Sequence, residues 1–300
     1  MRPVKQSVLP RLALLALIWG SSFLWIKLAD RGFSPAEVTF ARLALGAAVL
    51  FPVVLARREA VPRSAALWAQ IAVAALFANA IPYLLFAMAE KSVDSSTAGI
   101  INATTPLWTV VLALAVRHQR TVTGWQGAGL IVGFGGALLI FSPWHSATAV
   151  ASAGGLECLA ASVSYAVSYI YMDKFLAHRG LNPTTLSACQ LLVAALLLAV
   201  ALPVLGAGAP HASAASLTGL VILGVLGTGI AYVLNYQIIA SEGATVASTV
   251  TYLLPAVAIV LGVLVLGETV TAASLAGIAL VLAGVALTRR TRAAGRAPSR

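Results

Sequence analysis

Long apolar segments dominate the chain, separated at short intervals by turn-forming or charged residues. Each has about 20 residues, enough for an α-helix to cross the ~30 Å hydrocarbon layer of a membrane. The alternation of apolar and polar positions typical of a membrane β-barrel is absent, so a helical bundle is expected. The pattern predicts ten spanning helices, at residues 9–29, 34–56, 67–89, 95–116, 124–142, 154–175, 184–205, 217–240, 245–266 and 271–288.

Two matched prolines indicate that these ten helices are two copies of one unit. Pro106 and Pro255 lie 149 residues apart, and each interrupts a long apolar segment. Tyr83 precedes the first proline by 23 residues, and Tyr232 precedes the second by the same number. A hydrophobic protein with broken helices in corresponding places of its two halves is typical of a membrane transporter.

A second repeated sequence segment indicates the extent of the two halves. Residues 31–35 (Arg-Gly-Phe-Ser-Pro) recur as residues 179–183 (Arg-Gly-Leu-Asn-Pro). The longest break between spans, residues 142–155, contains proline, serine and glycine and separates the fifth span from the sixth. We therefore predict a first five-helix repeat at 1–144 and a second at 145–300, the latter ending in a basic tail.

The basic residues predict how the chain is oriented. With the N-terminus in the cytoplasm, fifteen lysines and arginines fall on the cytoplasmic side and three, Lys27, Arg31 and Lys91, on the other. This bias predicts that both termini are cytoplasmic. Because five is an odd number, the second repeat enters the membrane from the opposite side, and such an inverted repeat permits alternating access.

The composition agrees with a helical membrane protein. Sixty per cent of the residues are hydrophobic and 9% are charged, which excludes a soluble domain. The net charge of +10 could suggest a nucleic-acid partner, but the basic tail after Thr288 is better explained by helix orientation and contact with anionic lipid. Basic residues at the N-terminus could mark a signal peptide; the apolar run continues to Leu28, which favours a retained helix.

Arg42 is the arginine that falls clearly within an apolar run. A charge inside a membrane is costly and usually faces the bundle interior or water. It could attract an anionic group such as a carboxylate or hold a gate, and a structural role satisfied by helix ends remains the alternative. Its repeat partner is Gln190, so the second half keeps a polar side chain without the charge.

Polar residues cluster on one face of the third and eighth spans. Asn79 and Tyr83 lie four residues apart, and Pro82 between them frees a backbone carbonyl. Such groups either line a polar cavity or join helices by hydrogen bonds. The matched distance before the broken helix favours a cavity. The eighth span carries Thr228, Tyr232 and Asn235.

The broken helices themselves provide further candidates. Asn102 lies four residues before Pro106, and Tyr252 lies three residues before Pro255. The prolines could be simple kinks, but their matched placement favours a hinge role. Small residues around them allow close helix contact and expose backbone to a ligand.

Three aromatic residues are predicted to line the centre of the bundle. Tyr165 and Tyr169 share one face of the sixth span, and Trp19 lies in the first span. Their depth argues against an interfacial belt; packing and contact with a ligand ring or cation both remain open. Spans five and ten carry glycines seven apart, for which close helix packing is a sufficient explanation: Gly129, Gly136, Gly277 and Gly284.

Several chemistries lack a sequence signature. There is no cluster with metal-ligand spacing, no phosphate-binding loop and no catalytic pair, so we predict neither metal, cofactor nor enzymatic activity. Carboxylates fall near span ends, and Glu157 is the best candidate for a proton site, although an interfacial carboxylate explains it as well. Cys158 and Cys189 both fall in spans and are expected to be small packing residues.

These features together resemble one family. The segment 19–23 (Trp-Gly-Ser-Ser-Phe), Arg42, the Pro106 and Pro255 helices and the five-plus-five repeat look like the drug/metabolite transporter superfamily. The chain is similar to its EamA-type ten-helix permeases over residues 9–288, and most like the YddG-type amino-acid exporters of bacterial inner membranes.

The resemblance implies ten helices around a central cavity, with spans three, four, eight and nine forming walls and gates and spans one and six also lining it. It implies a bacterial inner-membrane protein that exports amino acids, particularly large apolar or aromatic ones, and related metabolites. The small four-helix relatives carry a carboxylate in their first helix. This chain has Trp19, Ser21 and Ser22 there, so their proton coupling is not carried over.

The sequence thus predicts a secondary transporter for a small zwitterionic or apolar metabolite, sufficient as a monomer. A nucleotide-sugar or other metabolite or drug carrier of the same superfamily is the main alternative, although anionic cargo should require more than one buried basic residue. A receptor or scaffold would not explain the inverted symmetry. The substrate-binding candidates are Trp19, Arg42, Asn79, Tyr83, Asn102, Tyr165, Tyr169, Gln190, Tyr232 and Tyr252.

Overall fold

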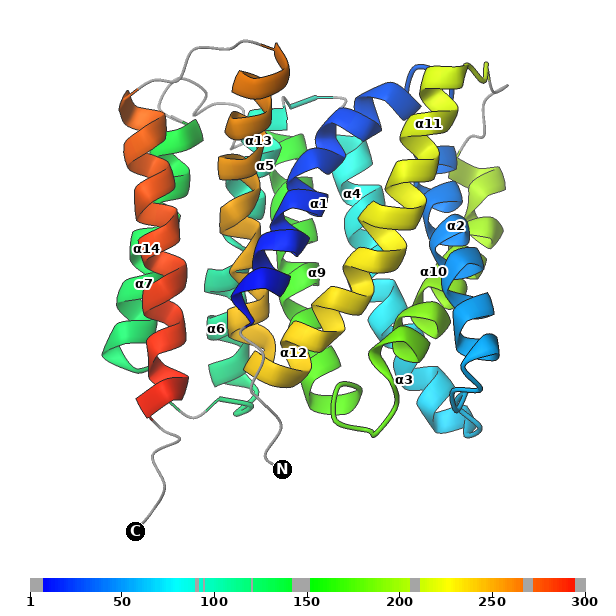
Figure 1. Ribbon diagram of the computed structural model, residues 1–300, viewed down its shortest axis with the longest axis horizontal. Helices are drawn as coiled ribbons and strands as arrows, with labels where there is room; N and C mark the ends of the chain where they lie inside the picture. Colours follow the sequence, from blue (N-terminus) through cyan, green and yellow to red (C-terminus); the bar gives the residue numbers. More distant parts are fainter. Residues whose placement is uncertain are drawn as a thin grey trace.

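The computed structural model of the chain is a helical bundle whose long helices run roughly side by side (Figure 1). It describes residues 8–89, 92–93, 95–119, 121–141, 152–205, 211–266 and 272–294. Every regular element in these ranges is a helix: α1 (Leu9–Ala29), α2 (Pro35–Ala56), α3 (Ala65–Ala75), η1 (Leu76–Ala80), α4 (Ile81–Ala89), α5 (Ser95–Asn102), α6 (Thr105–Ala115), α7 (Gly124–Phe141), α9 (Ala153–Phe175), α10 (Pro183–Leu205), α11 (Ala214–Ile222), η3 (Leu223–Ile230), α12 (Ala231–Ser248), α13 (Val250–Leu266) and α14 (Ala272–Ala294).

The ten predicted spans all correspond to helices in these ranges, with shifts at some ends. The predicted gap between the eighth and ninth spans, residues 241–244, contains a break in the structure. Helical hydrogen bonding continues to residue 248, but Gly243 has φ 80° and ψ 173°, a positive-φ conformation that breaks α12 there. The last helix continues to Ala294, six residues beyond the predicted end.

Five continuous helical segments are long and apolar enough to cross a membrane within the described ranges: Pro35–Ala56, Ala65–Phe86, Ala98–Ala115, Pro183–Leu205 and Ala214–Ser248. Shorter apolar segments lie at Leu9–Ser22, Gly124–Ile140 and Leu275–Thr288. These segments leave out α13 and α9. Of the two, α9 runs through the interior and carries buried hydroxyl groups. Its lower hydropathy therefore reflects protein neighbours on most sides.

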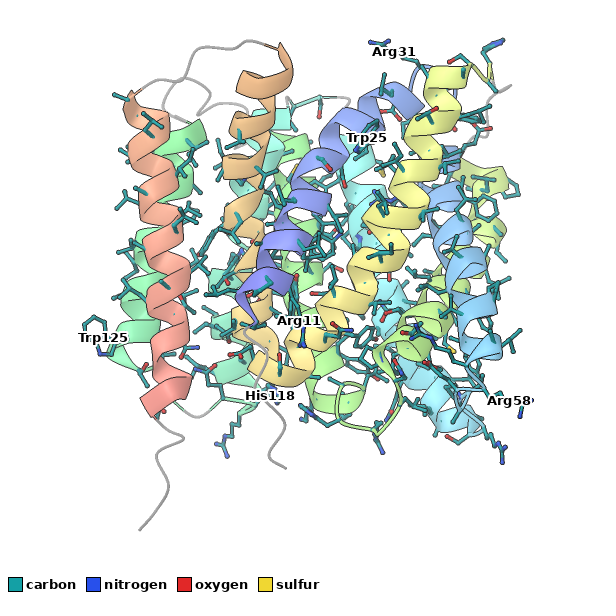
Figure 2. The ribbon with its side chains drawn as sticks, viewed as in Figure 1. Arg11, Trp25, Arg31, Arg58, His118 and Trp125 are labelled. Carbon is teal, nitrogen blue, oxygen red and sulfur yellow. The ribbon has the colours of Figure 1, made fainter. Side chains whose placement is uncertain are left out.

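The two halves run in opposite directions. In Figure 1, α1 starts at the face where both termini lie, whereas α9, the first helix of the second half, ends at that face. Arg58 and His118 lie at this same face and Arg31 at the opposite one (Figure 2). The inverted arrangement of two five-helix repeats is confirmed, while the predicted boundary at 144/145, Lys91 and residues 295–300 of the tail lie outside the described residues.

Glycines bring α7 and α14 into backbone contact at one flank of the bundle (Figure 1). A Cβ placed on Gly136 would lie 2.7 Å from the carbonyl oxygen of Gly277 and 2.7 Å from the amide nitrogen of Val281. A Cβ on Gly129 would lie 2.6 Å from the oxygen of Gly284. The expected close packing of these two spans is therefore confirmed.

Replacing Gly136 by alanine is expected to destabilise the folded protein by about 1–3 kcal/mol, because the new methyl group forces the two backbones apart. Gly135, its neighbour on α7, has open space at its Cβ position, with no atom within 4 Å. Gly135→Ala should leave stability equal or slightly higher, since alanine favours a helix over glycine. Thermal unfolding of the two variants in detergent measures the difference, and equal stability would contradict the packing account.

Both halves also contain a stretch of π-helix at the same place. These stretches are η1 in the third span and η3 in the eighth, and adding the repeat spacing of 149 to residues 76–80 gives 225–229, within η3. A π-helical turn leaves backbone carbonyls without their usual partner and is common at functional sites. The matching stretches therefore indicate a functional site in the space between the two spans.

Candidate functional site

A cavity of about 320 Å³ lies between the two halves, among α1, α2, α4, α5, α9, α12 and α13. Its lining extends from Trp19 and Tyr232 to Asp30 and Pro35, which flank Arg31 at one end of the bundle. Partial desolvation raises the pKa of the Asp30 carboxyl above its ordinary value. The volume lies within the range of small-molecule sites, about 300–1,000 Å³.

Local sequence places Arg42 two turns inside α2. Ser34 caps the helix by accepting a hydrogen bond from the Glu37 amide, and the Glu37 side chain accepts from the Ser34 amide at 2.7 Å. Pro35 occupies the first helical position, where its missing N–H is not needed. This capping box fixes where α2 begins, so the guanidinium reaches the cavity rather than the membrane edge.

Arg42 is held by two contacts that leave its charge uncompensated. Its Nε donates to Thr228 Oγ1 at 3.0 Å, and its Cζ lies 4.5 Å from the centroid of the Tyr83 ring. The residue is 9% exposed and lines the cavity. No carboxylate in the described part of the chain forms an ion pair with it. The remaining N–H donors are available to an anionic group, for which a guanidinium is well suited.

The equivalent contact in the other half is neutral. Gln190, the repeat partner of Arg42, donates from Nε2 to Asn79 Oδ1 at 2.8 Å, and Asn79 is the repeat partner of Thr228. The Tyr236 hydroxyl donates to Gln190 Oε1. All three side chains are fully buried. The two halves thus make the same contact across the bundle, once with a charge and once without.

The π-helical stretches accept hydrogen bonds from side chains on facing helices. The Tyr232 hydroxyl donates to the Ala78 carbonyl at 2.8 Å, which confirms that Pro82 frees a carbonyl four residues earlier. Trp19 Nε1 donates to the Gly227 carbonyl at 3.0 Å. Ala78 and Gly227 are themselves repeat partners. These bonds hold two aromatic rings as walls of the cavity while satisfying their polar atoms.

Aromatic side chains form most of the remaining wall. Phe86 stacks on Tyr165 with ring centroids 6.0 Å apart, and the Trp19 and Tyr232 rings meet edge to face at 6.2 Å. Tyr169 lies beside them and is 5% exposed. The cavity therefore combines the Arg42 cation with an extensive aromatic surface.

The structure brings most of the predicted binding residues to this cavity. Seven line it: Trp19, Arg42, Tyr83, Asn102, Tyr165, Tyr169 and Tyr232. Three lie outside its lining. Asn79 and Gln190 bind each other, and Tyr252 packs on Gly133 and donates from its hydroxyl to the Leu130 carbonyl at 3.2 Å. The side chain of Tyr252 therefore faces α7, away from the cavity.

The two prolines occupy matched positions but differ in local geometry. Pro106 is the second residue of α6, directly after a turn at Ala103 and Thr104. Pro255 lies inside α13, and the turn in that half comes earlier, at Thr249. Neither proline lines the cavity. Their role as hinges remains a prediction.

Two of the lining residues outside the predicted binding set are Phe86, which no sequence pattern singled out, and Asn235, which was noted as a polar residue of the eighth span. Phe86 follows Tyr83 by three residues and Asn235 follows Tyr232 by three, so each shares a helical face with a predicted residue. The 149-residue spacing also pairs them, since 86 + 149 = 235. The repeat spacing was therefore the signal that could have identified both positions.

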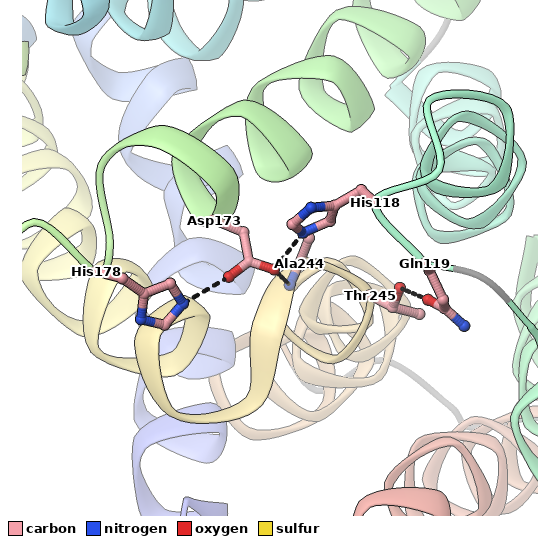
Figure 3. Close-up of polar contacts among 6 residues, drawn as sticks. All are labelled: His118, Gln119, Asp173, His178, Ala244 and Thr245. Carbon is pink, nitrogen blue, oxygen red and sulfur yellow. Dashed lines mark hydrogen bonds and ion pairs between the residues drawn. The ribbon is translucent and has the colours of Figure 1, made fainter.

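At the opposite end of the bundle, polar contacts gather around Asp173 (Figure 3). This carboxylate is bound by His118 Nε2 at 2.9 Å and His178 Nε2 at 3.2 Å, and it accepts from the Ala244 amide at 3.1 Å, directly after the Gly243 break. The bonds join the loops after α6 and α9 to α12. No group in the described ranges has three metal-ligating side chains placed to hold a metal ion.

A second contact lies at the same end of the bundle. Thr245 Oγ1 and Gln119 Oε1 are 3.2 Å apart, again joining α12 to the loop after α6 (Figure 3). At the same face, Thr185 donates to Glu59 Oε2 at 2.7 Å. The lining of the cavity thus reaches toward the Arg31 face, whereas these contacts join helices at the face that carries the termini.

The model of the EamA-like transporter family matches this chain twice, at residues 10–142 and 152–290. The chain belongs to the EamA-like transporter family. It is accordingly a multi-pass membrane protein with a small-molecule substrate. The two matches, each covering one half, agree with the inverted repeat seen in the fold.

Relatives cover nearly the whole chain. An uncharacterized transporter of Archaeoglobus fulgidus is 26% identical over 94% of this chain and 98% of its own length. A probable terminal-alkyne amino-acid exporter of Streptantibioticus cattleyicolor is 29% identical over 93% of this chain and 92% of its own. The uncharacterized inner membrane transporter YedA of Escherichia coli is 26% identical over 86% and 82%.

A solved crystal structure shares the fold, with a TM-score of 0.77 and 19% identity, covering 98% of this chain and 100% of the other. At this identity the likeness concerns the fold alone. The family membership and the fold establish an EamA-type transporter.

Proposed function

We propose that this EamA-like transporter exports amino acids with large aromatic or apolar side chains across the bacterial inner membrane. The observation that supports this most is Arg42, an uncompensated cation in a cavity whose other walls are largely aromatic. A carboxylate would bind the guanidinium, and the side chain would lie against the rings. The probable terminal-alkyne amino-acid exporter among its relatives is consistent with such cargo.

The mechanism proposed is alternating access between the two inverted repeats. Arg58 and His118 lie at the face that carries both termini, which the charge bias assigns to the cytoplasm. With that orientation, the cavity lining that reaches the other face would give access from outside, and the Asp173 contacts would restrict access from the cytoplasm. Exchange of conformation between the repeats would open the cytoplasmic side.

Counterflow in proteoliposomes tests this function. Vesicles are preloaded with a mixed amino-acid pool at equal pH on both sides, and one labelled amino acid is supplied outside at a time. We expect accumulation of the aromatic and large apolar amino acids. Tyr83→Ala should reduce it about tenfold or more, because it removes the ring under Arg42.

A folded protein that accumulates no amino acid would overturn the proposal. The same vesicles preloaded with nucleotide sugars then test the main alternative within the superfamily. Arg42 is the one cation among the described residues that line the cavity, which disfavours that alternative, since a nucleoside diphosphate carries more than one negative charge.

A further inference from the structure

Asn235 on α12 lines the cavity, and its amide oxygen is left without a hydrogen-bond partner in the described part of the chain. The residue is 4% exposed and lines the cavity beside Tyr232. Its Oδ1 has no hydrogen-bond partner among the described residues. A buried amide oxygen without a partner is destabilising, and such groups are uncommon in native structures. A rotation of the amide about its terminal bond would turn this oxygen toward the cavity, where a bound molecule would supply the partner.

The position of Asn235 relative to Arg42 limits which part of a ligand it can reach. Thr228, which holds Arg42, lies seven residues earlier along the same helical face. Seven residues of helix span about 10 Å. The carboxylate and amine of an amino acid are attached to the same carbon, so a carboxylate bound at the level of Thr228 would place the amine closer to Arg42 than to Asn235.

Tyr232 lies between these two polar positions. Its hydroxyl is bound to the Ala78 carbonyl, so it offers the cavity its ring. Along this face, a cation is followed by an aromatic surface and then by an amide. An amino acid with an aromatic side chain and a hydrogen-bonding atom at its far end matches that order.

Building on the proposed function, we propose that Asn235 binds the polar end of the substrate's side chain, which makes phenol- and indole-bearing amino acids the preferred cargo. An amide can offer either its oxygen or its nitrogen after a half-turn about its terminal bond. It can therefore accept from an indole N–H, or exchange a hydrogen bond in either direction with a phenol. Phenylalanine, which lacks such an atom, would leave the amide unpaired.

The test compares tyrosine with phenylalanine, which differ by one hydroxyl group. Counterflow of each is measured for the wild-type protein and for Asn235→Leu, a variant of similar size that removes the amide. We expect the wild type to prefer tyrosine by about tenfold or more, and Asn235→Leu to lose this preference by slowing tyrosine while leaving phenylalanine unchanged or faster.

Ser187→Ala is the matched control. Ser187 is also fully buried with an unpartnered Oγ, but it does not line the cavity, so its loss should leave both rates unchanged. Thermal unfolding in detergent confirms that each variant is folded. Equal slowing of both substrates by Asn235→Leu, or no effect on either, would overturn the assignment while amino-acid transport stands. If the wild type transports no amino acid at all, both the proposed function and the Asn235 assignment are overturned.

Discussion

Replacing Arg42 by glutamine is expected to slow tyrosine counterflow by about 10- to 100-fold. Glutamine reproduces the residue that the second half carries at this place, Gln190, so it keeps polarity and removes only the charge. Hydrogen bonds from a charged donor contribute about 1.5–3 kcal/mol, and each 1.4 kcal/mol corresponds to a factor of ten. The loss should appear in the ratio of maximal rate to half-saturation concentration.

Transport of an amino-acid amide distinguishes a role of Arg42 in binding the substrate carboxylate from a structural role. Tyrosinamide lacks the carboxylate, so its transport by the wild type should be weak and should change little in Arg42→Gln. Arg42→Lys keeps a charge but loses the planar guanidinium that lies over Tyr83, and should recover part of the rate. If Arg42→Gln slows tyrosine and tyrosinamide equally, the charge does not act on the carboxylate.

Replacing Asp173 by alanine is expected to open the face of the protein that carries the termini. The change removes the acceptor for both histidines and leaves the buried Ala244 amide unpaired. Loss of a buried acceptor costs about 1–3 kcal/mol, which shifts an equilibrium between closed and open states by about 5- to 150-fold. The cavity should then be reached from that face more often.

Cysteine labelling measures this opening. Ser248 is fully buried between the cavity-lining Thr251 and the Asp173 contacts, so Ser248→Cys reports access from the closed end. Cys158 and Cys189 are first replaced by alanine. We expect a membrane-impermeant maleimide, applied from the terminal face, to label Ser248→Cys faster when Asp173 is alanine.

His178→Gln is the control for this experiment. The His178 side chain is 62% exposed, so its contact with Asp173 is screened by water and its loss should have little effect. Unchanged labelling in Asp173→Ala would show that these contacts do not hold the end closed.

The helices were predictable because membrane insertion requires long apolar segments, and these segments dominate the sequence. The two matched prolines were enough to identify the repeat. The break at Gly243 falls within the predicted gap between the eighth and ninth spans, residues 241–244, where Ser241 and Glu242 interrupt the apolar run. The positive φ of Gly243 is a backbone property that the apolar pattern does not specify.

The cavity was predicted in part because depth and helical face select residues that point inward. They do not tell which of several inward neighbours a side chain contacts. Gln190 and Asn79 satisfy each other, and Tyr252 faces Gly133 on α7, so their polar atoms are used within the protein. The Asp173 contacts join three elements distant in sequence, which no local pattern reveals.

The Arg42–Thr228 and Gln190–Asn79 contacts occupy equivalent places in the two repeats, but only the first carries a charge. This difference makes the two faces of the carrier inequivalent. On the proposed mechanism, the two repeats exchange conformations, so each pair moves into the geometry of the other. Because a charged and a neutral pair differ in energy, the outward- and inward-facing forms are unequally populated without any gradient. Apparent affinities from the two faces then differ, while detailed balance keeps net flux at zero for equal concentrations.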